Sequence, residues 1–300
     1  MTIIIIVNYK GNEDTKECVD SIISQKWSDY KILIVDNSID PFYFQDLYKS
    51  VGCLDEVICI KSPKNEGFAA GNNFGIEYLE KNSISYDYLW FLNNDTLVLK
   101  DSLTNFVERM RRESLNNSGI HILGGKLYRF SEGNILQGVG GRYSKYRAVA
   151  KHIGDGVVDT GQFDNDVCID YPIGASMFVS KKFIDSVGGM YEGFFLYFEE
   201  LDWVLRGERL GFKVGYEYSV RVIHKEGRST DNSNRFKSFI ADSCQVRNRI
   251  IITKKYYRKY LLSVLFFVEL TLIKRLLYGE IKRFYMLNKV LCRALFKEHY

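Results

Sequence analysis

The stretch Tyr88–Thr96 constrains the fold more than any other part of the chain. It reads Y-L-W-F-L-N-N-D-T, so five apolar or aromatic residues lead directly into Asn93, Asn94 and Asp95. A short apolar run bounded by polar residues is typical of a strand that is buried on both faces of a parallel sheet. Open α/β sheets bind ligands outside the carboxyl ends of their strands. We therefore expect Asn93 and Asp95 at the mouth of a ligand-binding crevice, although Asn and Asp are also common in ordinary turns.

A metal site is the functional interpretation of this edge. One carboxylate with a neighbouring amide oxygen, as Asp95 and Asn93 provide, suits a hard divalent cation that takes further ligands from a substrate's phosphates. Much later in the chain, the apolar run Val220–Ile223 ends at His224. A lone histidine at a strand end is usually an ordinary polar residue. Only its combination with Asp95 suggests a metal ligand.

The N-terminal third of the chain alternates between strand and helix patterns. Strands are predicted at Thr2–Asn8, Lys31–Asp36, Glu56–Ile60 and Tyr88–Leu92, and helices at Glu13–Gln25 and Gly67–Lys81. This alternation predicts βαβ units and an α/β fold with a mostly parallel central sheet and flanking helices. Right-handed crossovers then place Asn8, Asp36 and Asp95 along one edge, where we expect a nucleotide to bind.

Two further stretches fit a nucleotide. Asp36 ends the strand pattern I-L-I-V-D and can accept hydrogen bonds from a base or a ribose. The segment Lys64–Gly75, which contains Asn65 and Gly71, opens a helix with small residues that allow close approach of the backbone to a ligand. It matches neither G-x-G-x-x-G nor the P-loop, which removes the usual grounds for a dinucleotide or ATPase site. Close packing of helix on strand explains these glycines as well as phosphate contact does.

The middle of the chain is less regular. Ser102–Ser114 is predicted to be an amphipathic helix and Ile120–Tyr128 a strand. Residues 131–167 are rich in Gly, Tyr and Asp, which favours twisted hairpins or a flap over the cleft. The apolar run Tyr171–Val179 is predicted to be a strand whose small residues make room for a sugar ring, although easy packing explains them equally well.

A second cluster of functional side chains lies at residues 188–206, where aromatic residues surround Glu199, Glu200 and Asp202. These carboxylates open a predicted helix Leu201–Leu210, and acidic residues at a helix N-terminus are modestly stabilising without any further role. The functional interpretation is a general base, because a carboxylate beside aromatic walls can deprotonate a hydroxyl nucleophile. Composition gives the two interpretations equal weight.

Length and composition favour one large domain with an appendage, because 300 residues of which 46% are apolar can fill a sizeable core. We expect residues 1–250 to form the main domain, with a nucleotide-binding half over 1–100 and an acceptor or catalytic half over 101–250. The six cysteines form no C-x-x-C pair and are expected to be reduced thiols of a cytoplasmic protein. The N-terminal run T-I-I-I-I-V-N lacks the features of a signal peptide.

The last part of the chain, residues 251–300, is expected to be a helical appendage of basic and aromatic character. Residues 254–300 hold eleven Lys or Arg against three Asp or Glu, a net charge of +8, whereas the whole chain carries +4. The longest apolar run, Leu261–Ile273, is too short for a bilayer, which requires about 20 residues. Helices lying in the interface of an anionic membrane fit this pattern, and packing on the body or at a homodimer interface is the alternative. Nucleic acid is not an expected partner, because no recognisable binding fold accompanies the charge.

Seven motifs, in this order along the chain, resemble those of bacterial family 2 glycosyltransferases, and most closely the rhamnosyltransferase-like and galactofuranosyltransferase-like branch. The motifs are V-N-Y-K (7–10), V-D-N-S (35–38), N-E-G-F-A-A-G-N-N (65–73), L-N-N-D-T (92–96), G-A-S-M (174–177), G-G-M-Y-E-G-F-F-L-Y-F-E-E-L-D (188–202) and H-K-E-G-R-S (224–229). The resemblance covers roughly residues 2–250. It implies a GT-A fold, which is a Rossmann-like nucleotide-diphospho-sugar transferase fold, and inverting transfer of a sugar.

The resemblance also implies roles for individual residues. Asp36 takes the place of the residue that holds the base, while Asn65 and Gly71 fall in the stretch that lines the nucleotide, as Asn8 and Asn94 do at the neighbouring strand ends. Asp95 matches the last residue of the family's D-x-D, so it would bind Mg²⁺ or Mn²⁺ with His224, and Asn93 would be a weaker ligand because many relatives carry Asp there.

The same resemblance implies how the second cluster works. Glu200 matches the catalytic base, in a position where Asp is commoner, and Glu199, Asp202 and Arg206 would support it. A single displacement assisted by a metal needs no enzyme nucleophile. The expected partners are a nucleoside-diphosphate sugar, with dTDP-rhamnose or a UDP-hexose as the first choice, and a lipid-linked or other saccharide acceptor.

The expected setting is surface-polysaccharide assembly, by a cytoplasmic protein that lies peripherally at the inner face of the membrane. Residues 131–167 and 225–235 are candidates for setting the sugar and acceptor specificity. Two alternatives stay open at this point. A sugar-phosphate nucleotidyltransferase shares the sheet type but normally carries a glycine-rich N-terminal loop with a basic residue, which the segment N-Y-K-G-N (8–12) matches poorly. A non-catalytic nucleotide-sugar-binding or lipid-binding protein would need no base.

Overall fold

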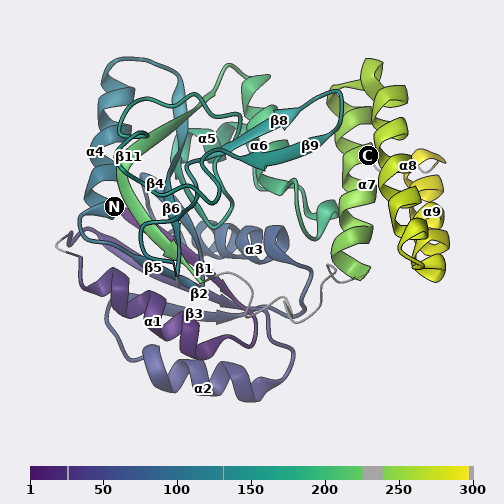
Figure 1. The fold of residues 1–300 in the computed structure, drawn as a ribbon. Coiled ribbons are helices and arrows are strands. Elements are labelled where there is room, and N and C mark those ends of the chain that lie inside the picture. The colour runs from purple at the N-terminus through teal and green to yellow at the C-terminus, as the bar shows by residue number, and fades with distance from the viewer. Residues whose placement is uncertain (26, 131, 226–238, 297–300) are drawn as a thin grey trace.

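The computed structural model describes residues 1–25, 27–130, 132–225 and 239–296. A central sheet carries helices on both faces, and three C-terminal helices stand beside it (Figure 1). The sheet strands are β1 (Thr2–Asn8), β2 (Tyr30–Asp36), β3 (Val57–Lys61), β4 (Tyr88–Asn93), β5 (Thr96–Val98), β6 (Ile120–Arg129), β7 (Leu136–Gly138), β10 (Ser176–Ser180) and β11 (Lys213–His224). The described helices that cover them are α1 (Asn12–Ile23), α2 (Pro41–Val51), α3 (Phe68–Lys81), α4 (Ser102–Leu115), α5 (Lys181–Val187) and α6 (Glu199–Glu208).

The sheet has a parallel half and a mixed half. Its order is β3-β2-β1-β4-β10-β6-β11-β5, with β7 paired to β6. Strands β3, β2, β1 and β4 run parallel, as the alternating pattern of the N-terminal third predicts. Strand β10 runs antiparallel to both β4 and β6, so the parallel order ends there. The predicted α/β class is confirmed, with a sheet that is wholly parallel over β3-β2-β1-β4 and mixed beyond it, where β6 and β11 again pair in parallel.

Alternation along β1 divides the core into two layers. Ile4 and Ile6 pack with α1, α2 and α4 on one face of the sheet, whereas Ile3 and Ile5 pack with α3, α6 and the C-terminal helices on the other. All four isoleucines are fully buried. A strand that is apolar at every position is therefore covered on both sides, as expected for a central parallel strand.

Strand β10 and helix α2 are among the elements that differ from the sequence-based prediction. The strand predicted over Tyr171–Val179 begins only at Ser176, because Pro172 has no amide hydrogen for a ladder and the Ser176 amide closes a turn onto the Ile173 carbonyl at 3.0 Å. Helix α2 was not predicted, although its start is marked in the sequence. Asp40 accepts a hydrogen bond from the Phe42 amide, and Pro41 occupies the first turn.

The C-terminal helices are α7 (Phe239–Tyr256), α8 (Leu261–Leu277) and α9 (Ile281–Phe296). Helix α7 crosses residue 250, where the sequence was divided into main domain and appendage. The hairpin of β8 (Gly141–Ser144) and β9 (Val149–His152) reaches from the sheet to these helices (Figure 1). Arg249 donates to the Arg147 carbonyl at 2.6 Å and Ser263 to the Tyr146 carbonyl at 2.8 Å. Among the described helices, none has both the length and the hydrophobicity needed to cross a membrane.

Candidate active site

Three polar residues meet at the carboxyl edge of the parallel strands. The registers pair Asn8 with Asp36 and Val7 with Asn93, so the ends of β1, β2 and β4 are level. The predicted common edge is thus present. A cavity of about 530 Å³ opens beside it, lined by the β1–α1 loop, the start of α2, and Asn94 and Asp95.

The two carboxylate oxygens of Asp36 differ in their hydrogen bonding. Its Oδ1 accepts hydrogen bonds from Asn8 Nδ2 at 3.0 Å, Ser38 Oγ at 2.7 Å and the Ser38 amide at 3.2 Å. Its Oδ2 is buried and finds no hydrogen-bond partner among the described residues. A buried acceptor without a donor costs free energy, about 1–3 kcal/mol in protein interiors. A ligand N–H or O–H arriving at this oxygen would remove that cost, as expected for a group that holds a base or a ribose.

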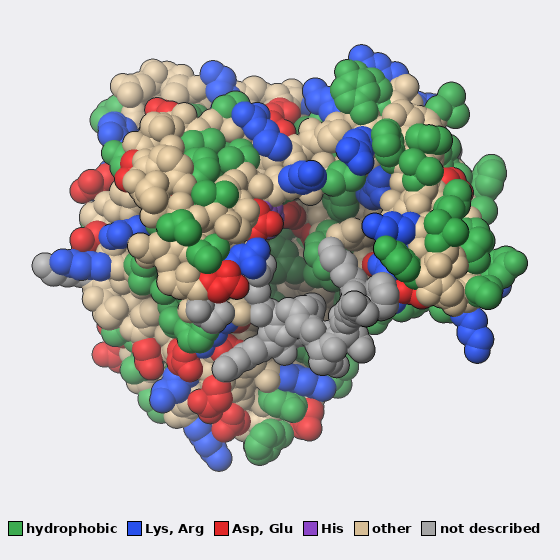
Figure 2. All heavy atoms as spheres, in the orientation of Figure 1, with side chains coloured by type: hydrophobic (Ala, Val, Ile, Leu, Met, Phe, Trp, Pro, Cys, Tyr) green, Lys and Arg blue, Asp and Glu red, His purple; other side chains and the backbone are tan. Residues whose placement is uncertain are grey.

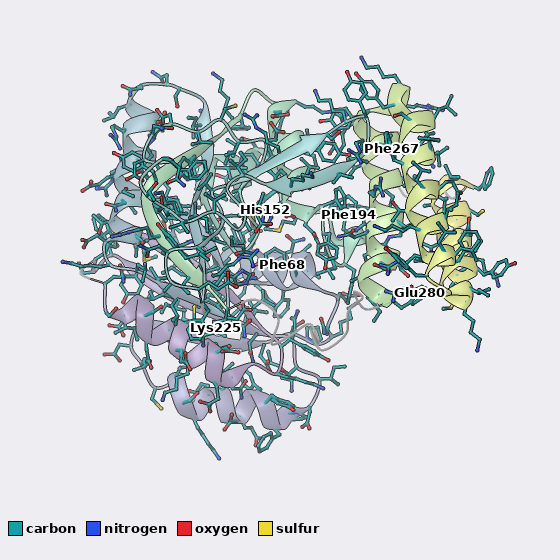
Figure 3. All side chains as sticks on the ribbon, viewed as in Figure 1. Phe68, His152, Phe194, Lys225, Phe267 and Glu280 are labelled. Carbon is teal, nitrogen blue, oxygen red and sulfur yellow. The ribbon has the colours of Figure 1, made fainter. Side chains whose placement is uncertain are left out.

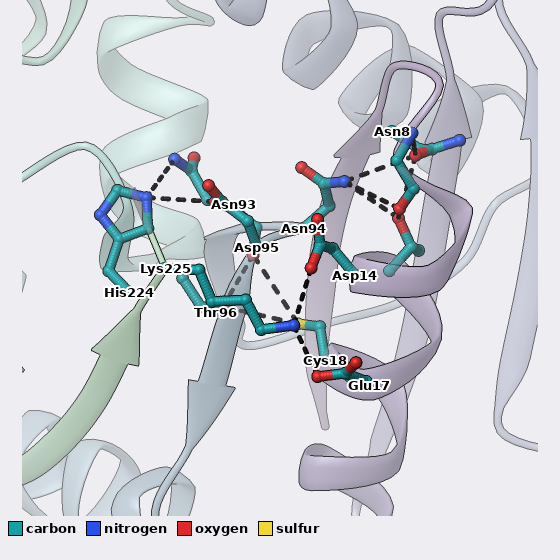
Figure 4. A network of polar contacts seen from close by, with 12 residues as sticks. Asn8, Asp14, Glu17, Cys18, Asn93, Asn94, Asp95, Thr96, His224 and Lys225 are labelled. Atoms are coloured by element: carbon teal, nitrogen blue, oxygen red, sulfur yellow. Dashed lines mark hydrogen bonds and ion pairs between the residues drawn. The ribbon is translucent and has the colours of Figure 1, made fainter. Parts of the chain in front are cut away.

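The two predicted asparagines at this edge are engaged within the protein. Asn8 Oδ1 accepts from the Gly11 amide at 3.1 Å and from Thr15 Oγ1 at 2.9 Å. Asn94 Nδ2 donates to Thr15 Oγ1 at 3.1 Å and to the Gly11 carbonyl at 3.3 Å (Figure 4). Both amides therefore shape the loop that joins β1 to α1, and this loop forms one wall of the cavity.

The glycine-rich start of α3 is shaped mainly by packing. A Cβ added at Gly71 would lie 2.8 Å from Val7 Cγ1 and 2.9 Å from Asn37 Nδ2, so Gly71 fits the interface with β1 and β2. Gly67 has a φ of +94° and approaches the Phe195 carbonyl, which a Cβ would meet at 2.5 Å. The Asn65 Oδ1 accepts from the Gly67 amide at 3.1 Å and fixes this turn. The packing explanation accounts for Gly71, and no contact here tests a role in binding the nucleotide.

The predicted metal ligands come together where β4, β5 and β11 meet. His224 Nε2 lies 3.1 Å from Asp95 Oδ1 and 3.4 Å from Asn93 Nδ2 (Figure 4). Across the ring, His224 Nδ1 lies 2.9 Å from Gln137 Oε1, an atom that can only accept. The Nδ1 atom therefore carries a hydrogen, and Nε2 donates to the Asp95 carboxylate when it carries one too. Without that second hydrogen, Nε2 and Asp95 Oδ1 are two acceptors that face each other, an arrangement suited to a shared cation.

The charge of Asp95 is well supported. Burial raises the pKa of Asp95, but the hydrogen bond and the positive charge from His224 outweigh it and hold the pKa below the usual value. Among the residues described, no point gathers three or more His, Cys, Asp or Glu. The donor set of one carboxylate, one imidazole and one amide fits a divalent cation that obtains its other ligands from a substrate.

Lys225 lies in the predicted specificity segment, but its contacts at this site were not predicted from the sequence. Its ammonium group is 3% exposed and pairs with Asp14 at 2.7 Å and Glu17 at 2.5 Å, both on α1 (Figure 4). Its backbone amide donates to the Asp95 carbonyl at 2.9 Å. Lys225 thus fastens the end of β11, and with it His224, to α1 and to Asp95. Its position directly after His224 was the available signal. Residues 226–235, part of a predicted specificity segment, lie outside the described residues.

The acidic pair sits at the start of α6, on the other side of the strand β10. Glu199 is 2% exposed, and its Oε1 finds no hydrogen-bond partner among the described residues. Glu200 is half-buried, and a Cβ added at Gly174 would lie 3.8 Å from its Oε1. Gly174 therefore leaves space in front of this carboxylate. The next residue, Ala175, accepts a hydrogen bond from the Asn93 amide at 3.0 Å, which joins the two clusters through one short segment.

Burial dominates the protonation of both carboxyls. It raises the pKa of Glu199 to about 8, with a further contribution from the charge of Glu200, and it raises the pKa of Glu200 to about 7. A group with a pKa near the working pH is effective in general base catalysis. Glu199 holds its proton near neutrality, and Glu200 is the member of the pair that has both space in front of it and the appropriate pKa.

The loop before α6 has an unusual backbone. Phe195, Tyr197 and Phe198 have φ values of +65°, +69° and +77°, in the region that side chains with a Cβ seldom adopt. Each such residue costs about 1–3 kcal/mol and persists only where its surroundings impose it. Strain of this kind immediately before Glu199 and Glu200 indicates that the position of this pair is imposed by neighbouring elements.

Asp202 and Arg206, which were expected to support Glu200, make contacts that hold α6 in place. Asp202 is fully buried and accepts from Arg206 Nε at 3.0 Å, Lys255 Nζ at 2.8 Å and Tyr256 Oη at 2.7 Å. Arg206 also donates to the carbonyls of Val187 and Gly189. These contacts fasten α6 to the preceding loop and to α7.

Comparison with known proteins agrees with this geometry. Residues 3–151 match the family model described as glycosyl transferase family 2. The chain belongs to the family 2 glycosyltransferases. It is 25% identical over 256 residues to the low-salt glycan biosynthesis hexosyltransferase Agl10 of Haloferax volcanii, covering 85% of this chain and 76% of that protein. It is 23% identical over 233 residues to the rhamnosyltransferase WbbL of Escherichia coli strain K12, covering 75% of this chain and 83% of that protein.

Solved structures confirm the GT-A fold. GalNAc-T7 with UDP, GalNAc and Mn²⁺ matches with a TM-score of 0.68 and 13% identity over 87% of this chain, which spans 49% of that structure. The mannosyltransferase PcManGT of Pyrobaculum calidifontis, in complex with GDP-Man and Mn²⁺, matches with a TM-score of 0.57 and 12% identity over 99% of this chain and 81% of that one. The family 2 assignment makes the chain a glycosyltransferase, in preference to the nucleotidyltransferase and non-catalytic alternatives.

Proposed function

We propose that this glycosyltransferase moves one sugar, with inversion, from a nucleoside-diphosphate sugar to a hydroxyl of a saccharide. The observation that carries this proposal is that two acidic centres of different character, at Asp95 and at Glu200, are joined by the short segment Gly174–Ala175. Asp95 with His224 lies at the strand edge beside the cavity, whereas Glu200 lies beyond Gly174, where burial raises its pKa to about 7. A charged leaving group needs the first environment and an incoming hydroxyl needs the second.

In this proposal, different residues bind the nucleoside, hold the metal and act as the base. The free oxygen of Asp36 and the loop held by Asn8 bind the nucleoside. Asp95 and His224, with Asn93 as a weaker ligand, would hold Mg²⁺ or Mn²⁺, which would neutralise charge on the diphosphate as it leaves. Glu200 removes the proton of the acceptor hydroxyl as that oxygen attacks, and one in-line displacement inverts the anomeric centre. The Mn²⁺ complexes of two structural neighbours support the choice of a divalent ion.

The donor and acceptor are proposed from the relatives' names. A hexosyltransferase of glycan biosynthesis and a rhamnosyltransferase support a hexose or deoxyhexose donor, with dTDP-rhamnose or a UDP-hexose as the first choice. The acceptor would be a lipid-linked saccharide of a bacterial surface polysaccharide such as O-antigen or capsule. Structural neighbours with bound UDP or GDP-Man support a nucleotide-linked donor.

The C-terminal helices would bring the enzyme to the inner face of the membrane. Helix α8 carries one buried apolar stripe, Val264, Val268 and Leu272, and a second, exposed stripe. The exposed stripe consists of Leu262, Phe266, Leu270, Ile273 and Leu277. Lys and Arg side chains surround the hydrophobic ones on these helices (Figure 2). Apolar side chains framed by cations suit an anionic lipid surface, and a second copy of the chain is the competing occupant.

Flotation with vesicles tests the membrane part. Vesicles that contain phosphatidylglycerol should bind the protein, and Phe266→Glu should reduce binding, while Leu115→Glu, at an exposed leucine on α4, should not. A dimer in solution that Phe266→Glu dissociates, without vesicle binding, would support the competing occupant.

Release of nucleoside diphosphate from a panel of dTDP-, UDP- and GDP-sugars tests the chemical part, with Mg²⁺, Mn²⁺ or EDTA. Slow release from one donor that needs metal, and faster release with acceptor, would support the proposal. Acceptor-dependent turnover should disappear in Glu200→Gln and persist in Glu208→Gln, an exposed glutamate of the same helix. Turnover that is indifferent to EDTA would contradict the roles given to Asp95 and His224.

A further inference from the structure

The loop that leads into α6 is held from outside the main sheet by helix α7. In the space-filling view, a hollow separates the sheet domain from the C-terminal helices (Figure 2). The loop bridges them, and Figure 3 shows Phe194 between the start of α3, marked by Phe68, and helix α7. Phe194 itself is fully buried. The loop therefore depends on contacts from two sides, namely Gly67 on α3 and the face of α7.

One buried amide makes most of the contact on the α7 side. Asn248 is fully buried, and its Nδ2 lies 3.3 Å, 2.9 Å and 3.0 Å from the carbonyl oxygens of Phe194, Leu196 and Tyr197. Its Oδ1 accepts from Arg247 Nε at 3.0 Å, which fixes the orientation of the amide group. The donor end of Asn248 is thus directed at the carbonyls of the left-handed segment.

Arg247 also forms hydrogen bonds to this loop. Its Nη2 donates to the Gly193 carbonyl at 2.7 Å and to the Phe194 carbonyl at 2.5 Å. Two helical turns later on the same face of α7, Lys255 contacts Asp202. Helix α7 therefore holds the segment on both sides of Glu199 and Glu200, before α6 begins and within its first turn.

We infer that Asn248, assisted by Arg247, is a positioning residue for the catalytic base. Its hydrogen bonds stabilise the three left-handed residues Phe195, Tyr197 and Phe198, and through them the place at which α6 begins and Glu200 projects toward Gly174. This inference rests on the proposed role of Glu200. It makes α7 part of the catalytic apparatus, whereas α8 and α9 carry the surface stripe.

The test compares kinetics and donor binding in full-length variants. Asn248→Ala should lower kcat about 10²-fold, the effect expected when a catalytic group is misplaced by about 1 Å. The dissociation constant of the nucleoside diphosphate should not change, because Asp36, Asp95 and His224 do not contact this loop. Asn288→Ala is the matched control, since among the described residues its amide donates to the Phe284 carbonyl of its own helix α9 at 3.0 Å. It should leave kcat unchanged.

A pH profile separates positioning from general stability. The ionisable groups that act with Glu200 are Glu199 beside it and Tyr171 before β10. Release of the loop admits water, which lowers the raised pKa of Glu200, so the acid limb of kcat should move to lower pH in Asn248→Ala. A variant that is only less stable would lose activity without a shift of this limb.

Milder variants cover the case in which Asn248→Ala does not fold. Arg247→Met keeps the aliphatic stem and removes the donors, so it should lower kcat and move the limb in the same direction, while Arg247→Lys should restore part of both. Unchanged kcat and limb in Arg247→Met and a folded Asn248→Ala would overturn the inference. If Glu200→Gln also retained turnover, the proposed base would be wrong; if only Glu200→Gln were inactive, the error would lie in the positioning role alone.

Discussion

The two acidic centres of this molecule are built in opposite ways. Asp95 is buried beside His224 and behind Lys225, so its pKa is held below the usual value despite burial. Glu199 is buried and Glu200 is half-buried, and burial raises the pKa of both. Burial is the largest influence in both places, and only the presence of cationic partners decides the sign. Where environments push the pKa values of two carboxyl groups apart in this way, one group commonly stays charged and the other carries the proton.

The difference also shows in the backbone. The Asp95 side stands on the ends of parallel strands in register, with its asparagines bonded inside the protein. The Glu200 side follows a loop with three left-handed residues and is held by a helix from the C-terminal part of the chain. The proposed donor side is therefore held by its sheet, whereas the proposed base side is held by contacts that a single substitution can remove.

The largest effect is expected where the base side is broken. Glu200→Gln removes the proton acceptor and keeps the shape, so kcat should fall about 10³-fold, within the range for general base catalysis. Donor binding should stay within a factor of about two, because binding belongs to the other centre. Steady-state kinetics and calorimetric titration of the nucleoside diphosphate measure the two quantities. Loss of donor binding together with kcat would mean that the two centres are not separate.

The converse variant breaks the charged centre. Asp95→Asn keeps the hydrogen-bonding shape and removes the negative charge opposite His224, so binding of nucleoside diphosphate in the presence of Mn²⁺ should weaken about 10- to 100-fold. Binding in EDTA should change little. Asp20→Asn, an exposed carboxylate on α1, serves as the control. Equal weakening with and without metal would assign Asp95 a structural role.

The pH dependence compares both centres in one measurement. Since burial raises the pKa of Glu200 to about 7, and a base acts only when deprotonated, kcat/KM should rise with pH and level off above about pH 7. Below that pH it should fall about tenfold per unit. Asp95 adds no limb in this range, because the bond to His224 lowers its pKa. If the limb stays in Glu200→Asp but vanishes in Asp95→Asn, the limb belongs to Asp95, and its assignment to Glu200 is wrong.

The sequence predicted the two centres unequally for the same physical reason. Strand ends in a parallel sheet are local features that meet by topology, so Asn8, Asp36 and Asp95 could be placed on one edge from pattern alone. The ligand pair of Asp95 and His224 also follows from strand ends. Contacts between distant helices leave no such pattern. The bonds from Asn248 to residues about 50 positions earlier, and those from Lys225 to α1, depend on packing that periodicity does not encode. Pro172, in contrast, was a visible signal against the long strand predicted at Tyr171–Val179.

The smallest effect tests the buried neighbour of the base. Between its ordinary value of 4.5 and about 8, Glu199 binds a proton in the folded state but not in the unfolded chain, so folding loses stability as pH rises through this window. Glu199→Gln stays neutral throughout and escapes that loss. Its Tm should exceed that of the unmodified protein by a margin that grows by a few degrees from pH 5 to pH 8.

Glu77→Gln, at an exposed position on α3, should show no such growth and serves as the control for this difference. Thermal unfolding at a series of pH values measures the margin. The kcat limb assigned to Glu200 should remain in Glu199→Gln, because burial sets the pKa of Glu200. A margin in Tm that does not depend on pH would mean that Glu199 is already ionised in the folded protein. Its buried Oε1, which has no hydrogen-bond partner among the described residues, would then need a nearby cation to stabilise the charge. Arg247, whose charge opposes the rise in the Glu199 pKa, is the described residue placed to provide it.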